Sequence, residues 1–239
     1  MHGPGALWAL LAVGSTVAGG MVALRLRHRL SWVMAFTGGV VIGVALLDIL
    51  PESIDRLPSG AEVGESVTAG FLLFFILSRV VVLHHRDEPS AAEGHRPVGA
   101  MGAAALSFHS FIDGFAIGAA FAESASLGFA VLIAVVGHDF ADGMNTVTFV
   151  LSQHGDSHRA RGWLYVDAVA PLFGAIVGSF VLVSSDAFGR GLGVLAGIFL
   201  AIGAAELLPE AHSETSAGRI WLTIAGVALL FVVSRVAGL

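Results

Sequence analysis

Residues 31–50, SWVMAFTGGVVIGVALLDIL, decide the fold class. This stretch of twenty residues carries one charged side chain, that of Asp48. A helix of roughly 20 mostly apolar residues crosses the hydrocarbon core of a bilayer. The run is continuous and lacks the alternation of a barrel strand, so it predicts a transmembrane helix.

The rest of the chain repeats this pattern. Of the 239 residues 56% are hydrophobic and 13% are charged, against about 25% charged residues in a typical soluble domain. This composition excludes a soluble domain and a disordered chain. We therefore predict an all-α integral membrane protein, with residues 1–239 as one polytopic membrane domain of about eight transmembrane helices. The other seven segments are 5–24, 66–85, 98–122, 127–151, 163–185, 189–209 and 219–238.

Charge and cysteine content narrow the chemistry. The net charge is −6, and the basic residues are twelve arginines without a lysine. No basic face is available for a nucleic acid, so we expect no nucleic-acid partner. Cysteine is absent, so any metal site must use histidine, carboxylate or amide ligands.

The arginines predict the orientation in the membrane. One side of the predicted topology holds nine arginines: Arg25, Arg27, Arg29, Arg79, Arg86, Arg96, Arg159, Arg161 and Arg219. The other side holds three: Arg56, Arg190 and Arg235. Arginine and lysine gather on the cytoplasmic side of membrane proteins. We therefore expect a multi-pass protein of the cell (plasma or inner) membrane with both termini extracytoplasmic.

Two regions of the chain resemble each other. Gly43-Val-Ala-Leu-Leu-Asp48-Ile-Leu-Pro51-Glu52 parallels Ile202-Gly-Ala-Ala-Glu206-Leu-Leu-Pro209-Glu210, and a Ser-Arg-Val triplet follows each, at Ser78 and at Ser234. Corresponding spans are five apart, so they cross the membrane in opposite directions. Such an inverted repeat is typical of transporters. It predicts a first repeat over 1–85 and a second, inverted repeat over 163–239, with 98–151 as a central helix pair.

The central pair carries charges at bilayer depth, where they are rare and usually functional. His109 and Asp113 lie four residues apart, as do His138 and Asp142, so each pair shares a helix face. Two imidazoles and two carboxylates form a complete ligand set for a divalent cation. The alternative is that each histidine bonds a carboxylate to hold the helices together. Asp139 is a further candidate ligand, and Ser110 and Asn145 are either secondary ligands or interhelical hydrogen-bonding groups.

Other acids leave two readings open. Asp48, Glu52, Glu206 and Glu210 either attract and release cations at the two mouths or are solvated helix ends. Asp167 either faces the site or complements a helix N-terminus. Gly114 and Gly143, which follow the two acids of the central pair, are expected to allow close helix approach.

At these residues the chain resembles the ZIP (Zrt-/Irt-like protein) family of divalent-metal transporters. The motif His109-Ser-Phe-Ile-Asp113-Gly114 is similar to the family pattern His-Asn-x-x-Asp/Glu-Gly, and the span ending in Glu206-Leu-Leu-Pro-Glu210 is also family-like. The resemblance covers essentially the whole chain. The chain differs from common family patterns in having Ser110, Ala141, Gly143 and Ala170.

The resemblance implies a 3+2+3 helix arrangement, transport toward the cytoplasm, and a metal site formed by His109, Asp113, His138 and Asp142. In some members a second metal uses the residues after each histidine, here Ser110 and Asp139. Some members are thought to move a transport bundle against a scaffold.

We therefore expect a carrier of divalent metal ions, with zinc as the first expectation and iron, manganese and cadmium as alternatives. No cofactor is expected beyond the transported metal. The expected partners are the metal ion and the lipid bilayer, with a homodimer as one option for the assembly. The alternatives are an intramembrane zinc-dependent hydrolase and a membrane metal-binding protein that transports nothing.

Overall fold

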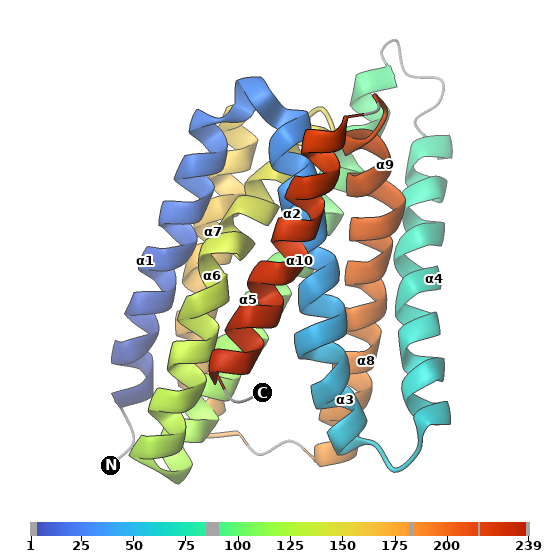
Figure 1. The fold of residues 1–239 in the computed structure, drawn as a ribbon. Coiled ribbons are helices and arrows are strands. Elements are labelled where there is room, and N and C mark those ends of the chain that lie inside the picture. Colours follow the sequence, from blue (N-terminus) through green and yellow to red (C-terminus); the bar gives the residue numbers. More distant parts are fainter. Residues whose placement is uncertain (1–3, 85–90, 182–183, 215, 238–239) are drawn as a thin grey trace.

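The computed structural model describes residues 4–84, 91–181, 184–214 and 216–237, and within them the chain is a bundle of long helices (Figure 1). In chain order the elements are α1 (Pro4–Arg25), η1 (Arg27–Arg29), α2 (Leu30–Val44), η2 (Ala45–Ile49), α3 (Leu50–Arg56), α4 (Gly60–His84), α5 (Ala91–Glu123), α6 (Ala125–Ser152), α7 (Ser157–Gly178), α8 (Ser185–Leu200), η3 (Ala201–Leu207), α9 (Leu208–Ala211) and α10 (Ala217–Ala237).

The helices have the length and composition of membrane spans. In the described ranges, seven helical stretches are long and apolar enough to cross a membrane. The remaining long helix, α6, has 28 residues and packs along α1 and α5 at the place of the predicted fifth span. The prediction of an all-α membrane protein is confirmed. Arg86 and the ends of the predicted spans at residues 85 and 238 lie outside the described residues.

Some predicted span boundaries are wrong because helix caps override the hydropathy pattern. The predicted span 163–185 is the helix Ser157–Gly178. It begins early because the carboxylate of Asp156 accepts hydrogen bonds from the backbone N–H groups of Arg159 and His158, over 2.8 and 2.9 Å. These donors hold the pKa of Asp156 below its ordinary value. Similarly, Ser59 Oγ accepts a hydrogen bond from the backbone N–H of Glu62 at the start of α4.

The helices pack in two groups. The first group contains α1, α5, α6 and α7, in which α5 packs on α7 and α6, and α1 packs on α6 and α7. In the second group α2 packs on α10, and α4 packs on α8. The two groups meet chiefly where α2 and α10 contact α6 and where α4 contacts α5. The start of α1 and the end of α10 lie at the same end of the bundle, as an even number of spans requires (Figure 1).

The contact between α2 and α10 and the contact between α4 and α8 use corresponding residues. We call these two contacts the matched crossings. A Cβ on Gly39 of α2 would overlap the carbonyl oxygen of Thr223 on α10, and a Cβ on Gly197 of α8 would overlap that of Val67 on α4. In the other direction, Gly226 approaches the carbonyl of Phe36, and Gly70 approaches that of Val194. Each member of a matched pair holds the corresponding place beside the repeated motifs, so the two crossings are equivalent in structure.

A widened π-helical turn precedes the proline of each Leu-Pro-Glu motif. The backbone N–H of Leu50 bonds to the carbonyl of Ala45, and that of Leu208 bonds to the carbonyl of Gly203, each five residues back. A proline inside a helix lacks an N–H group, and its ring clashes with the carbonyl four residues earlier. A π turn relieves that clash by widening the helix. These turns place Asp48 and Glu206 inside widened segments of their spans.

Candidate metal centre

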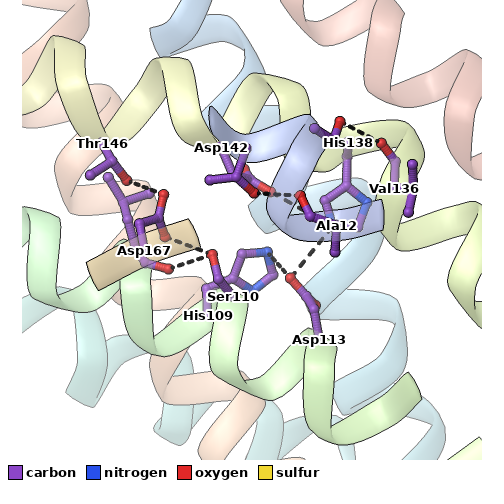
Figure 2. A network of polar contacts seen from close by, with 12 residues as sticks. Ala12, His109, Ser110, Asp113, Val136, His138, Asp142, Thr146 and Asp167 are labelled. Atoms are coloured by element: carbon purple, nitrogen blue, oxygen red, sulfur yellow. Dashed lines mark hydrogen bonds and ion pairs between the residues drawn. The ribbon is translucent and has the colours of Figure 1, made fainter. Parts of the chain in front are cut away.

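Four of the predicted site residues converge between α5 and α6. His109 and Asp113 come from α5, His138 and Asp142 come from α6, and one ligand atom of each lies within 4.8 Å of the others. Figure 2 shows the four side chains pointing toward one another. The structure thus brings together the two His/Asp pairs that the sequence placed on separate helix faces.

The spacing of these atoms suits a tetrahedral metal ion. Asp113 Oδ2 lies 3.3 Å from His109 Nε2 and 3.5 Å from His138 Nε2. Asp142 Oδ2 lies 3.7 Å from His138 Nε2. Ligands about 2.0–2.2 Å from a tetrahedral zinc ion are separated from one another by about 3.3–3.6 Å. The three observed separations lie in or just above this range, and all four ligand atoms lie within 4.8 Å of one another, so the atoms would need to move closer together to coordinate one ion.

The same atoms lack hydrogen-bond partners although they are buried. His109 and His138 are 2% and 4% exposed, Asp113 is 9% exposed, and Asp142 is fully buried. Unpartnered buried atoms include both ring nitrogens of His109, both carboxylate oxygens of Asp142, Asp113 Oδ2 and His138 Nε2. Leaving such groups unpaired costs free energy. The carboxylates of Asp113 and Asp142 contact the histidines at ion-pair distance, and a bound cation would satisfy the buried oxygen and nitrogen atoms that these contacts leave without a hydrogen bond.

Supporting helices hold the two metal-bearing helices in place. A Cβ on Gly114 would overlap the carbonyl oxygen of Pro171 on α7, and a Cβ on Gly143 would overlap that of Thr16 on α1. The expectation of close approach at these glycines is confirmed. The approach is made to α7 and α1, on the sides of α5 and α6 that carry these glycines.

The second helix group also touches the site. The ring of Phe199 on α8 meets the ring of His109 edge-on, with a centroid separation of 5.0 Å. The imidazoles of His109 and His138 are nearly parallel, with an interplanar angle of 22°. The donor set thus lies where an apolar aromatic side chain from the other helix group covers it.

Ser110 is bonded to an acid that the sequence left unassigned. Ser110 Oγ donates a hydrogen bond to Asp167 Oδ1 over 2.7 Å, and Thr146 Oγ1 donates one to Asp167 Oδ2 over 2.8 Å. All three side chains are fully buried, and Figure 2 shows Asp167 between the two hydroxyls. Asp167 of α7 therefore bridges α5 and α6 beside the metal-site residues, and it does not complement the first turn of its own helix.

The remaining candidate ligands, Asp139 and Asn145, do not belong to the four-residue cluster. Asp139 is fully buried with both oxygens unpartnered, but it is not in the group whose ligand atoms lie within 4.8 Å. Asn145 is fully buried, and both of its amide atoms lack a hydrogen-bond partner. Both are therefore buried polar side chains of α6 whose oxygen and nitrogen atoms have no hydrogen-bond partner, one residue after His138 and three residues after Asp142.

The predicted mouth acids differ in their surroundings. Asp48, half-buried in its π turn, lies within electrostatic range of His138, Asp113 and His109. Glu206 forms an ion pair of 3.1 Å with Arg79 and accepts a hydrogen bond from Ser78 Oγ. Glu52 is paired with Arg56. Of Asp48, Glu52 and Glu206, Asp48 is therefore the acid that interacts with the residues of the His/Asp cluster.

The cluster has a definite chemical capacity. Two neutral imidazoles and two carboxylates cancel the charge of a divalent cation, which lowers the cost of holding that ion in an apolar interior. Imidazole and carboxylate together suit zinc and neighbouring transition metals.

Comparison with known proteins bears on the family. The model of the family described as ZIP zinc transporter matches residues 83–234. A zinc transporter ZupT of Corynebacterium aurimucosum is 29% identical to this chain over 93% of both sequences. Another, of Xanthomonas axonopodis pv. citri, is 30% identical over 86% of this chain and 85% of its own. The zinc transporter foi of Drosophila melanogaster is 31% identical over half of this chain and 17% of its own length. The matched region includes both helices that carry the His/Asp cluster and runs into the last helix, and this chain belongs to the ZIP family of zinc transporters.

Proposed function

We propose that the protein carries zinc across the membrane into the cytoplasm through His109, Asp113, His138 and Asp142. The observation that supports this most directly is the buried cluster whose ligand atoms lie within 4.8 Å of one another and lack other partners. A set of two imidazoles and two carboxylates also accepts iron, manganese and cadmium, and these are the competing cargoes.

The arginine distribution supports inward transport. The hydrogen bond from Arg27 to Ser157 places the α1 and α7 ends of the arginine-rich side together, and that side is the cytoplasmic one by the positive-inside rule. Both termini then face outward. Helix α5 runs away from the arginine-rich side, so Asp113 lies farther outward than His109.

Differences in burial support entry from outside. The side chain of Asp113 is 12% exposed, whereas that of Asp142 is fully buried. Asp48 adds a negative charge within electrostatic range of Asp113 and His138. We propose that an incoming cation meets Asp48 and Asp113 first, and that Asp142 and Asn145 lie on its path toward the cytoplasm.

The helix packing supports a 3+2+3 inverted repeat in which one group of helices moves against the other. The matched crossings Gly39–Thr223 and Gly197–Val67 join spans of opposite repeats in the second group. The metal-site residues all belong to the first group. A rigid second group beside a metal-carrying first group suits alternating access.

One bound ion is proposed for each protein. Ser110, which a second metal would use, gives its hydroxyl to Asp167. Asp139 remains as a side chain that can hold an ion transiently beside the main shell.

Zinc flux into proteoliposomes tests the proposal. The purified protein is reconstituted around a zinc-sensitive dye, and initial uptake rates are measured for zinc, iron, manganese and cadmium. Alanine at His109, Asp113, His138 or Asp142 should nearly abolish uptake. Thr37→Ala, a change at a buried polar residue of α2, is the matched control and should retain it.

The same preparation separates the alternatives. Wild-type uptake by Asp142→Ala would refute the proposed shell. Zinc binding without any flux would identify a metal-binding protein that does not transport. Lipid or peptide hydrolysis that is lost on chelation would identify a hydrolase, although the family is one of transporters.

A further inference from the structure

A cavity of about 490 Å³ opens between the arginine-rich ends of α1 and α7. Arg25 and Arg27 line it from the end of α1 and from η1, and Arg161 and Tyr165 line it from α7. Ser157, Arg161 and Tyr165 are spaced four residues apart, so they share one face of α7. Three guanidinium groups from two separate segments therefore surround one hollow.

The cavity gathers positive charge that no carboxylate among the described residues pairs with. Its lining contains no carboxylate. Among the described residues, Arg25, Arg27 and Arg161 form no ion pair, and Arg27 donates its hydrogen bond of 2.5 Å to the hydroxyl of Ser157. Five other arginines of the protein do have carboxylate partners: Arg56, Arg79, Arg159, Arg190 and Arg219. Like charges held together favour binding of an anion.

The cavity also has an apolar side that continues into the membrane. Met21 and Leu24 complete its lining, and both helices are membrane spans that end at the cavity. After Tyr165 in the chain, α7 carries three apolar and exposed side chains: Val166, Val169 and Phe173. A ligand that fits this cavity therefore needs an anionic group that contacts the three arginines and apolar chains that lie along α1 and α7.

We propose that this cavity binds the phosphate of an anionic phospholipid from the cytoplasmic leaflet. Arginine forms paired hydrogen bonds with phosphate oxygens, and basic pockets between helices on the cytoplasmic side suit acidic lipid head groups. Free inorganic phosphate shares the anionic chemistry, but it would leave the apolar lining and the exposed face of α7 unused. The lipid would join α1 to α7, the two helices that support α6 and α5.

Lipid retention tests the site. The protein is placed in nanodiscs of phosphatidylcholine with increasing phosphatidylglycerol, and the phosphatidylglycerol that stays bound is measured by native mass spectrometry. Each of Arg25→Gln, Arg27→Gln and Arg161→Gln should weaken retention by about fivefold, since each basic residue near the membrane surface contributes about 1 kcal/mol. Arg161→Lys should restore most of it, because the charge is kept.

The control is Arg159→Gln, which removes a charge from the same side of the protein. Arg159 pairs with Asp156 and does not line the cavity, so this variant should retain lipid as the wild type does. Zinc binding in pure phosphatidylcholine checks that each variant is folded. If a folded Arg161→Gln variant retained phosphatidylglycerol like the wild type, the proposal would be wrong. If inorganic phosphate displaced the lipid at low concentration, the site would be a free-phosphate site, which would also overturn it.

Discussion

Ser110 Oγ lies 2.7 Å from Asp167 Oδ1, and this hydrogen bond joins α5 to α7 one residue away from a metal-site histidine. The second oxygen of Asp167 binds Thr146, one helical turn after Asp142 on α6. A single buried carboxylate therefore fixes the positions of both metal-bearing helices relative to each other.

Asp167→Ala should lower both stability and zinc affinity. The change leaves the buried hydroxyl of Thr146 without its acceptor, at a cost of about 1–3 kcal/mol, and leaves the Ser110 hydroxyl with the longer bond of 3.3 Å to the carbonyl of Leu106. Asp167→Asn keeps one oxygen acceptor and should lie between alanine and the wild type. Thermal unfolding in detergent and calorimetric zinc binding would measure the two effects. An alanine variant as stable as the wild type would show that Asp167 does not hold the helices.

Ser110→Ala should change zinc affinity much less than His109→Ala. The serine hydroxyl is bonded to Asp167, whereas both ring nitrogens of His109 are unpartnered beside the other ligands. Asp139→Ala should be intermediate, because Asp139 is buried and unpartnered but outside the cluster. Calorimetric titration of each variant with zinc gives the order of their zinc affinities. Equal losses for Ser110→Ala and His109→Ala would place the serine in the coordination shell.

Gly114→Ala and Gly143→Ala should destabilise the folded protein by about 1–3 kcal/mol, the usual cost of overpacking. Each added methyl group would meet the backbone carbonyl of a supporting helix, which cannot move aside as a flexible side chain does. Gly14→Ala and Gly162→Ala are matched controls, since a Cβ at either position meets nothing within 4 Å. Unfolding midpoints in one detergent compare the four variants. Equal midpoints would mean that the helices can separate slightly at little cost.

A cysteine at Ser59 should react with an impermeant thiol reagent added outside cells, and a cysteine at His158 should react only after the membrane is opened. The two positions lie at opposite ends of the bundle. Ser59 is in the connection before α4, and His158 is in the first turn of α7. The chain has no cysteine of its own, so the background is low. Labelling of His158→Cys in intact cells would reverse the proposed orientation and the proposed direction of transport.

Much of the fold could be read from the sequence because hydropathy and helix period are local properties. The spacing of four residues placed His109 with Asp113 and His138 with Asp142 for the same reason, and the resemblance between the two motifs pointed to their convergence. The start of α7 was missed because the capping carboxylate of Asp156 precedes a polar first turn that hydropathy passes over.

Contacts between distant helices were harder to foresee. Nothing local to Asp167 states that its two oxygens meet hydroxyls 57 and 21 residues away. The π turns did leave a signal, a proline three residues after each intramembrane acid at Asp48 and Glu206. A proline at that place must lose a backbone hydrogen bond, so a widened turn could have been expected there.

The matched crossings place the same glycine-to-carbonyl contact at two positions of one protein, Gly39 with Thr223 and Gly197 with Val67. Gly39 and Gly197 meet the same kind of backbone partner, but in helices α2 and α8, which run in opposite directions along the bundle (Figure 1). An identical substitution at the two glycines therefore repeats one physical perturbation with the two faces of the membrane exchanged. A difference between the two effects would then come from the remaining neighbours, such as Phe71 beside Gly197, and from the unlike surroundings at the two ends of the bundle.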